Sequence, residues 1–272
     1  MARGSNTGEE GMLAERRRRS RDEPATMTAS ASAKVHQERG ALRPRKPVPH
    51  VRQAFNWDCG IACVLMIVRS LGLKHVDLRY LRDVCGTTSI WTIDLAHLLR
   101  HFDLRVKFYT VTLGANPAYA DEKFYKEHMH EDEVRVHRLF SLAGEVGVEV
   151  NHRSLRLDEL AEVCASPQHL VLILVDKRVL QQGSLPGSEG KGATTTSLLC
   201  CGMLGNLGNS DYVGHYVVLS DYDSATREFW VKDPASREPT TFVKDTTLEK
   251  ARKSFGTDED LIVVPFAEGL WS

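Results

Sequence analysis

The sequence predicts an α+β fold in which N-terminal helices pack on a C-terminal antiparallel sheet. Apolar residues recur at helical spacing through the first half of the chain, and short β-rich runs dominate the last third. Helices followed by strands in this order are typical of the α+β class. A chain of 272 residues with 42% hydrophobic residues is long enough to bury one sizeable core.

Hydrophobic patterning predicts the individual elements. The segment Cys59–Leu71 is apolar nearly all round, as in a buried helix, and Gly72 ends it. Helical spacing predicts further helices over residues 76–84, 93–102, 124–146 and 157–164. Alternating or dense apolar runs predict strands over residues 104–113, 148–151, 170–175, 215–219, 228–231 and 261–264.

The folded part is expected to begin near Val48. Residues 1–47 are rich in Arg, Ser, Ala, Gly and Glu and carry few large apolar side chains, so they cannot offset the entropy of ordering. We therefore predict a disordered basic tail over residues 1–47 and a single domain over residues 48–266. A flexible insertion rich in Gly, Ser and Thr is expected inside that domain, over residues 181–210.

Composition excludes several classes of function. The 35 basic residues are balanced by 36 acidic ones, so charge does not predict a nucleic-acid-binding protein. No segment reaches the roughly 18 to 20 apolar residues of a membrane span, and no signal-peptide core is present. The six cysteines are then expected to be reduced, in a cytoplasmic protein. The run Arg16–Arg19 leaves a nuclear address open, and a plastid transit peptide is disfavoured by Glu9, Glu10 and Glu15.

The segment QAFNWDCGIAC, residues 53–63, carries the most informative chemistry. Cys59 stands at the first turn of the predicted buried helix, where free backbone N–H groups and the helix dipole favour a thiolate. Gly60 is interpreted as keeping the approach to the sulfur open, and Gln53 is close enough to turn its amide toward the same point. Cys59 is a candidate nucleophile; the alternative is a buried structural thiol.

A thiol nucleophile needs a base, and the base needs an orienting acceptor. His215 opens an apolar strand, and Asp233 closes the next one, which Pro234 ends. If the two strands form a hairpin, both side chains lie at one edge of the sheet. The candidate catalytic residues are therefore Cys59, His215, Asp233 and Gln53.

Other chemically suggestive residues have simpler interpretations. Cys63 lies one turn after Cys59 and is expected to pack in the core rather than form a redox pair. His128 and His130 occupy alternate helical positions, which do not face the same way. We predict no metal site from these residues.

The candidate residues resemble the papain-like peptidase domains of bacteriocin-processing exporters. The matching segments keep that family's chain order: Gln53, Asp58-Cys59-Gly60, Gly214–Val218 and Asp233-Pro234. The resemblance implies a papain-like fold in which the Gln helps to form the oxyanion hole, the Cys is the nucleophile, the His is the base and the Asp orients it. The predicted long helix and the insertion depart from that family.

Longer strings, covering almost all of Val48–Val264, resemble the soluble plant guanylyl cyclases and their animal relatives, the guanylyl cyclase domain-containing proteins. These strings are FNWDCGIACVLMI, TTSIWTIDLAHLL, GANPAY, FYKEHMHEDEVRV, GHYVVLSDYD and ARKSFGTDEDLI. The resemblance implies conversion of GTP to cyclic GMP, with magnesium or manganese, in cyclic GMP signalling. The sequence has no Walker-type or GxGxxG loop, so nucleotide-binding residues stay unidentified. Asp94 and Asp258–Asp260 are candidate carboxylates, interpreted as a helix cap and a turn.

Three functions are open at this point. The closer resemblance implies a guanylyl cyclase acting on GTP. The chemistry of Cys59, His215 and Asp233 indicates a thiol hydrolase, a peptidase or isopeptidase acting on a peptide substrate. The third is a catalytically idle adaptor on the same scaffold, because fold alone does not decide function. No protein partner is indicated.

Overall fold

The computed structural model describes Met1 and residues 46–116, 129–182 and 212–265, and all the elements discussed below lie in the unit that begins at Lys46. The predicted tail lies outside the described residues up to residue 45. So do residues 183–210 of the predicted insertion and residues 124–128 of the predicted long helix. Residues 181–182 of that insertion belong instead to the end of a helix.

The helices agree with the predicted ones to within a few residues, apart from two that the sequence did not indicate, α7 and α8. The helices are α2 (Cys59–Ser70), α3 (Leu78–Cys85), α4 (Thr92–Arg100), α5 (Met129–Val146), α6 (Leu157–Ala165), α7 (Lys177–Gln182) and α8 (Asp245–Arg252). Within the described residues, no helix combines the length and apolar composition that a membrane span requires.

The strands form one sheet of seven in the described part of the chain, in the order β2-β1-β7-β3-β4-β5-β6. They are β1 (Val106–Thr110), β2 (Val148–His152), β3 (His169–Asp176), β4 (Gly214–Asp223), β5 (Glu228–Lys232), β6 (Thr241–Lys244) and β7 (Leu261–Pro265). Neighbours pair antiparallel except β1 and β2, which are parallel. The predicted α+β class is confirmed. The expectation that strands come last is wrong in detail, because β1, β2 and β3 alternate with helices.

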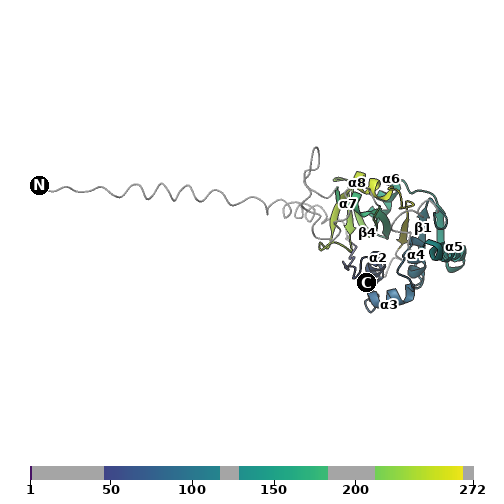
Figure 1. The fold of residues 1–272 in the computed structure, drawn as a ribbon. Coiled ribbons are helices and arrows are strands. Elements are labelled where there is room, and N and C mark those ends of the chain that lie inside the picture. The colour runs from purple at the N-terminus through teal and green to yellow at the C-terminus, as the bar shows by residue number, and fades with distance from the viewer. Residues whose placement is uncertain (2–45, 117–128, 183–211, 266–272) are drawn as a thin grey trace. The chain divides into compact units, whose positions relative to one another are not determined.

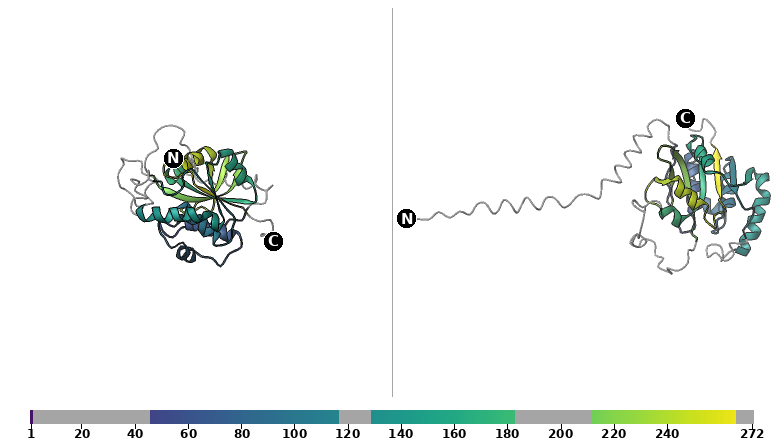
Figure 2. Two further views of the ribbon diagram at one scale, coloured as in Figure 1. Left: turned by 90° about the vertical axis from the view of Figure 1, so that its right-hand side faces the viewer. Right: turned by 90° about the horizontal axis from the view of Figure 1, so that it is seen from above.

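Helices cover both faces of the sheet. In Figure 1, α2, α3 and α4 lie below the sheet and α6, α7 and α8 above it, and Figure 2 shows the sheet between the layers from other sides. The side chains of β3 alternate between two separate cores: Leu170, Leu172 and Leu174 pack with α2–α5, and Val171, Ile173 and Val175 with α6–α8. This two-sided burial explains why the strand is a continuous apolar run.

Helix α2 is buried along its whole length. Every residue in it except Arg69 is buried, which explains the lack of a polar face in its sequence. At Gly60 an added Cβ would lie 2.7 Å from Cδ1 of Leu95 and 3.0 Å from Cδ2 of Tyr216. The glycine is therefore required for close packing of α2 against α4 and β4, a different reason from the open approach to the sulfur that the sequence suggested. Gly72 follows the helix with φ of +88°, where glycine is favoured.

Candidate active site

Three separate elements bring Cys59, His215 and Asp233 together. Cys59 is the first residue of α2, His215 the second residue of β4, and Asp233 directly follows β5. Since β4 and β5 pair antiparallel, the beginning of β4 and the end of β5 lie at the same edge of the sheet. Helix α2 packs on β4 and presents its N-terminus at that edge.

The histidine is held between the carboxylate and the thiol. The Nε2–H of His215 donates to Oδ1 of Asp233 at 2.7 Å, and the backbone N–H of Ala235 donates to the same oxygen at 2.8 Å. The other side of the imidazole hydrogen-bonds the Cys59 thiol. Since Nε2 is used by Asp233, Nδ1 is the nitrogen left for the sulfur. The arrangement is nucleophile, base and orienting acceptor in one chain.

Burial and charge compete at this site, and charge prevails. Burial by itself raises the pKa of the Cys59 thiol, but the hydrogen bond and positive charge of His215, with the N–H groups of Tyr216 and Gly60, bring the pKa below its ordinary value. Burial likewise lowers the pKa of His215, and the bonds to Asp233 and Cys59 outweigh it and raise the pKa to about 9. The lowered thiol pKa and the raised imidazole pKa both favour the thiolate–imidazolium form of the pair.

Asp233 stays ionised in spite of its burial. Burial raises the pKa of this carboxyl, but its bonds to His215 and to the N–H of Ala235 hold the pKa below its ordinary value. His50 contacts the backbone carbonyl of Asp233 through Nε2 at 2.9 Å, so the turn that carries the carboxylate is fixed from a second side. The imidazolium therefore has a stable anionic partner.

Gln53 lies next to this turn, but its amide is engaged locally. The backbone N–H of Gln53 donates to the carbonyl of Pro234 at 3.0 Å. The side-chain Nε2–H donates to the carbonyl of Phe55 at 2.6 Å, and Oε1 is buried with no hydrogen-bond partner among the described residues. The structure thus brings the Gln53 segment to the site, and the amide nitrogen is directed at Phe55 rather than at the sulfur.

Cys63 differs from Cys59 in its surroundings. Burial, the nearby Cys59 and the Asp233 carboxylate all raise its pKa well above the ordinary value. Cys63 is therefore a neutral thiol in the core, packed one turn behind Cys59.

The candidate carboxylates for a metal have structural partners. Asp94 accepts from the backbone N–H of Trp91 at 2.8 Å and pairs with Arg135, as a helix cap does. Asp258 accepts from the hydroxyl of Thr112 at 2.7 Å. Among the described residues, no three His, Cys, Asp or Glu side chains are placed to hold a metal ion. Asp94 and Asp258 are each engaged within the fold, so their contacts do not support a site for the magnesium or manganese that a cyclase would require.

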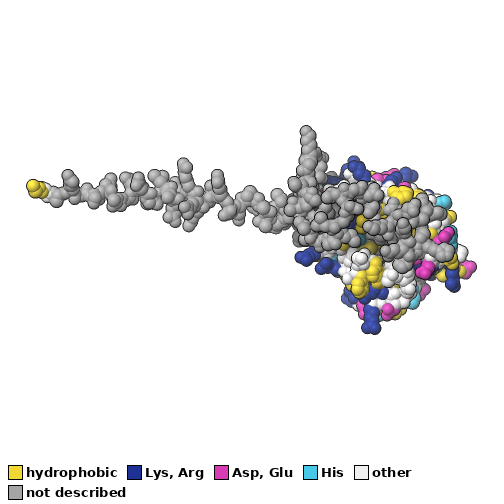
Figure 3. Space-filling view, in the orientation of Figure 1, with side chains coloured by type: hydrophobic (Ala, Val, Ile, Leu, Met, Phe, Trp, Pro, Cys, Tyr) yellow, Lys and Arg dark blue, Asp and Glu magenta, His cyan; other side chains and the backbone are white. Residues whose placement is uncertain are grey.

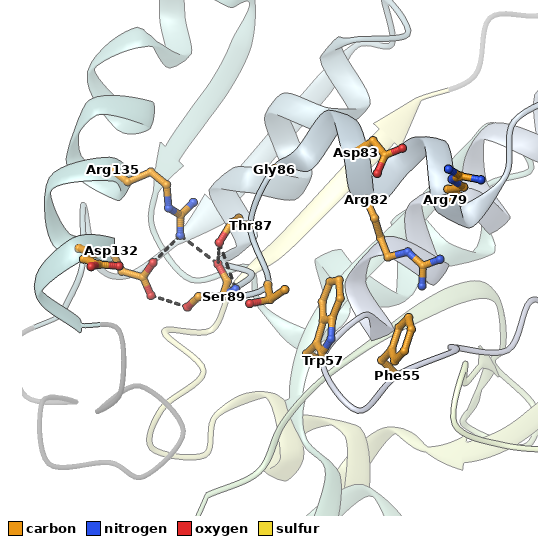
Figure 4. Close-up of a pocket in the computed structure, with 12 residues that line it drawn as sticks. Phe55, Trp57, Arg79, Arg82, Asp83, Gly86, Thr87, Ser89, Asp132 and Arg135 are labelled. Carbon is orange, nitrogen blue, oxygen red and sulfur yellow. Dashed lines mark hydrogen bonds and ion pairs between the residues drawn. The ribbon is translucent and has the colours of Figure 1, made fainter.

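A cavity of about 790 Å³ lies beside the loop that precedes Cys59. Phe55 and Trp57 line one side, and the opposite side comes from the loop 86–89 and the beginning of α5 (Figure 4). In Figure 3, hydrophobic and basic side chains adjoin at the lower end of the face shown, over α3. The sequence analysis did not predict the side of the cavity that Phe55 and Trp57 form. The available signal was the pair of aromatic residues in FNWDC, directly before Cys59.

The sequence comparisons agree with each other. The model of the family described as "Guanylylate cyclase" matches residues 48–264. A curated relative, "Guanylyl cyclase 1" of Arabidopsis thaliana, is 43% identical over 217 residues, which cover 80% of this chain and 75% of that protein.

Solved structures give a more distant likeness. One is a double glycine motif protease from an AMS/PCAT transporter in complex with the leader peptide, and another is a C39-like peptidase from Bacillus anthracis. Each is 13% identical, with a TM-score of 0.42, and the match covers 82% of this chain and 96% of the other.

Proposed function

This chain belongs to the guanylyl cyclase family, and from the site that its fold assembles we propose that it is a thiol hydrolase that cleaves a peptide or isopeptide bond. One observation carries the proposal: the hydrogen-bonded chain of Cys59, His215 and Asp233 at the N-terminus of a buried helix. A thiolate paired with an imidazolium is the resting state of a cysteine hydrolase.

The proposed reaction has two steps. The Cys59 thiolate attacks the carbonyl carbon of the substrate, and the tetrahedral intermediate expels the amine, which takes its proton from the His215 imidazolium. The product is a thioester on Cys59. His215, now neutral, removes a proton from a water molecule and the hydroxide attacks the thioester. The C–S bond breaks, the carboxylic acid leaves, and the Cys59 thiolate and His215 imidazolium are regenerated.

The negative oxygen of the intermediate needs hydrogen-bond donors. The first N–H groups of a helix have no partner inside the helix, so the N-terminus of α2 offers donors next to the sulfur. The Gln53 amide is the second proposed donor, which requires it to turn from the Phe55 carbonyl when substrate binds.

The proposal is tested with the full chain and the Cys59→Ala variant on peptide and isopeptide substrates. We expect turnover by the wild type and none by Cys59→Ala, because the proposed thioester forms on the Cys59 sulfur. Cys63→Ala is the matched control, since it removes a neutral thiol one turn away and should retain activity. Equal turnover by wild type and Cys59→Ala would contradict the proposal.

Guanylyl cyclase activity is the second candidate, favoured by the name of the relative with 43% identity. The two candidates make opposite forecasts for Cys59→Ala. A cyclase should lose less than about tenfold, or about 1.4 kcal/mol, because Cys59 belongs to no metal-holding group of side chains in the described part of the chain. Cyclic GMP formation from GTP with magnesium or manganese, retained in Cys59→Ala, would establish the cyclase. If both assays are blank and the thiol titrates near pH 8.5, as free cysteine does, the adaptor is the remaining function.

We place this function in the cytoplasm. A catalytic thiolate must stay reduced, and the glutathione and thioredoxin systems of that compartment keep thiols reduced.

A further inference from the structure

An ion pair connects the loop before the nucleophile to α3. Asp58, which directly precedes Cys59, is completely buried, and its carboxylate pairs with Nη1 of Arg82 at 3.2 Å. The same carboxylate accepts from the backbone N–H groups of Phe55, at 2.8 Å, and Ala54, at 3.1 Å. One buried side chain therefore holds both the loop and the arginine.

The side chain of Asp58 does not cap α2. Asp58 is the N-cap residue of α2, where an aspartate usually accepts from the first N–H groups of the helix. Asp58 makes no such side-chain bond to the helix, and its carboxylate turns back toward the preceding loop. The N–H groups at the beginning of α2, next to the sulfur, are thereby left available.

Arg82 also contacts an aromatic side chain of the loop that precedes Cys59. Its guanidinium lies 4.9 Å from the centroid of the Phe55 ring, and that ring stacks on Trp57 at 5.8 Å with an angle of 6° between the planes. Figure 4 shows the guanidinium of Arg82 next to the two parallel rings. Phe55 is about half exposed, so the rest of the protein does little to fix it. The planar guanidinium supplies both the ion pair and the stacking contact.

The residues fixed in this way carry the groups proposed to bind the oxyanion. The carbonyl of Phe55 accepts the hydrogen bond of the Gln53 amide, and Asp58 directly precedes the first N–H groups of α2. We propose that Arg82 is a positioning residue of the oxyanion site, which it orders through Asp58 and Phe55 without contacting substrate. The inference rests on the proposed thiol hydrolase function.

Two reactions of the same sulfur separate this role from a purely structural one. Alkylation by iodoacetamide forms an S–C bond and releases iodide, with no oxyanion on the way. Acylation by 4-nitrophenyl acetate passes through a tetrahedral oxyanion, then releases 4-nitrophenolate and leaves an acetyl group on Cys59. An oxyanion-positioning residue affects only acylation, whereas a residue that merely holds α2 or its thiolate affects both.

The experiment uses the full chain, with Cys59→Ala as the blank. For Arg82→Met we expect acylation of Cys59 to slow by about tenfold to a hundredfold, as for a displaced catalytic donor, while alkylation and its pH dependence stay within about twofold. Arg82→Lys keeps the charge but not the planar stacking and should fall between. Arg79→Met, on the exposed side of the same helix, is the matched control and should change neither rate.

The Asp58→Asn variant gives a second, independent test of the inference. It should reproduce the slow acylation, and the double variant with Arg82→Met should be no slower than the slower single variant, because the two residues act as one unit. Equal losses in both reactions, or unchanged acylation in Arg82→Met, would overturn the inference. If Arg82→Met does not fold, Arg82→Lys and Asp58→Asn test the inference by the same comparison of the acylation rate with the alkylation rate. A wild type acylated no faster than Cys59→Ala would instead refute the proposed function, and the inference with it.

Discussion

The ionised form of Cys59 is favoured by its neighbours and not by exposure to water. It is only 7% exposed, so burial alone would keep the thiol neutral. His215 supplies a positive charge, and Asp233 stabilises that charge, so the ionic form of the Cys59–His215 pair is favoured. The stabilisation is mutual, since His215 favours the charged forms of Cys59 and Asp233, and both favour the charged form of His215.

A second buried carboxyl, Asp260, gives a prediction about stability. Burial and the nearby Asp258 raise its pKa well above the ordinary 3.8, so over a range of pH above 3.8 Asp260 is protonated more in the folded protein than in the unfolded one. The stabilisation by this group is complete below about pH 3.8 and declines as pH rises. Asp260→Asn cannot ionise, so we expect it to stabilise the fold at about pH 7.5 by a few degrees more than at about pH 4.

Thermal unfolding of wild type and Asp260→Asn at both pH values measures this difference, and the other titrating groups cancel because both proteins carry them. The same difference in melting temperature at the two pH values would refute the raised pKa of Asp260.

At the residue scale, sequence reasoning identified the residues whose position follows from local rules. A cysteine at a helix start and two residues at the ends of paired strands were placed correctly at one edge of the sheet. The contacts of Arg82 and the local bond of Gln53 could not be predicted, because both depend on how α3 and the loop meet in three dimensions.

At the scale of elements, α2 is the part of the fold that the site depends on most. Its N-terminus must approach β4 closely enough for the sulfur to meet the imidazole, and Gly60 makes this approach possible. The helix is buried on every side, so small changes in its packing are transmitted to Cys59.

Gly60→Ala should therefore destabilise the protein by about 1 to 3 kcal/mol, because the new Cβ would lie 2.7 Å from Leu95. Leu95→Ala removes the clashing atoms, so the double variant should lose at least about 0.5 kcal/mol less than the sum of the single variants. Gly144→Ala, in α5, is the control, since an added Cβ there meets nothing within 4 Å. Denaturant unfolding gives these free energies, and strict additivity would show that α2 tolerates the extra methyl group.

The elements that sequence analysis missed are short and weakly patterned. Helix α8 has eight residues, of which only Leu248 and Ala251 are buried apolar ones, so its periodicity is not readable. Strand β6 has four residues and lies at the edge of the sheet. The second helical layer was in principle predictable, because the unbroken apolar run of β3 indicates a strand covered on both faces.

For the molecule as a whole, the boundary of the folded part is a testable quantity. Lys46 donates through Nζ to the carbonyls of Cys164 and His169, and Val48 is buried in the core. Deletion of residues 1–45 should change the melting temperature by less than a few degrees. Deletion of residues 1–48 removes these contacts and should lower it clearly. Equal melting temperatures for the two truncations would show that Lys46 and Val48 contribute nothing.

The family and the site lead to different functional proposals at this scale. The strings shared with guanylyl cyclases could be recognised from sequence, and the family is established by the match over residues 48–264. Which chemistry the fold supports could not be concluded from those strings, because it depends on charges that the fold brings together from α2, β4 and the turn after β5.

The central claim is that Cys59 is a thiolate held by His215, and the pH dependence of its alkylation tests this most directly. The rate of iodoacetamide modification of Cys59 in the full chain is followed by mass spectrometry, for wild type and His215→Ala. We predict a half-maximal rate in the wild type below the pH of an ordinary thiol, about 8.5, and in His215→Ala above it. In that variant burial, the largest effect on the thiol pKa, is opposed only by the N–H groups of Tyr216 and Gly60. A wild-type midpoint at or above about 8.5, unchanged in His215→Ala, would contradict the account.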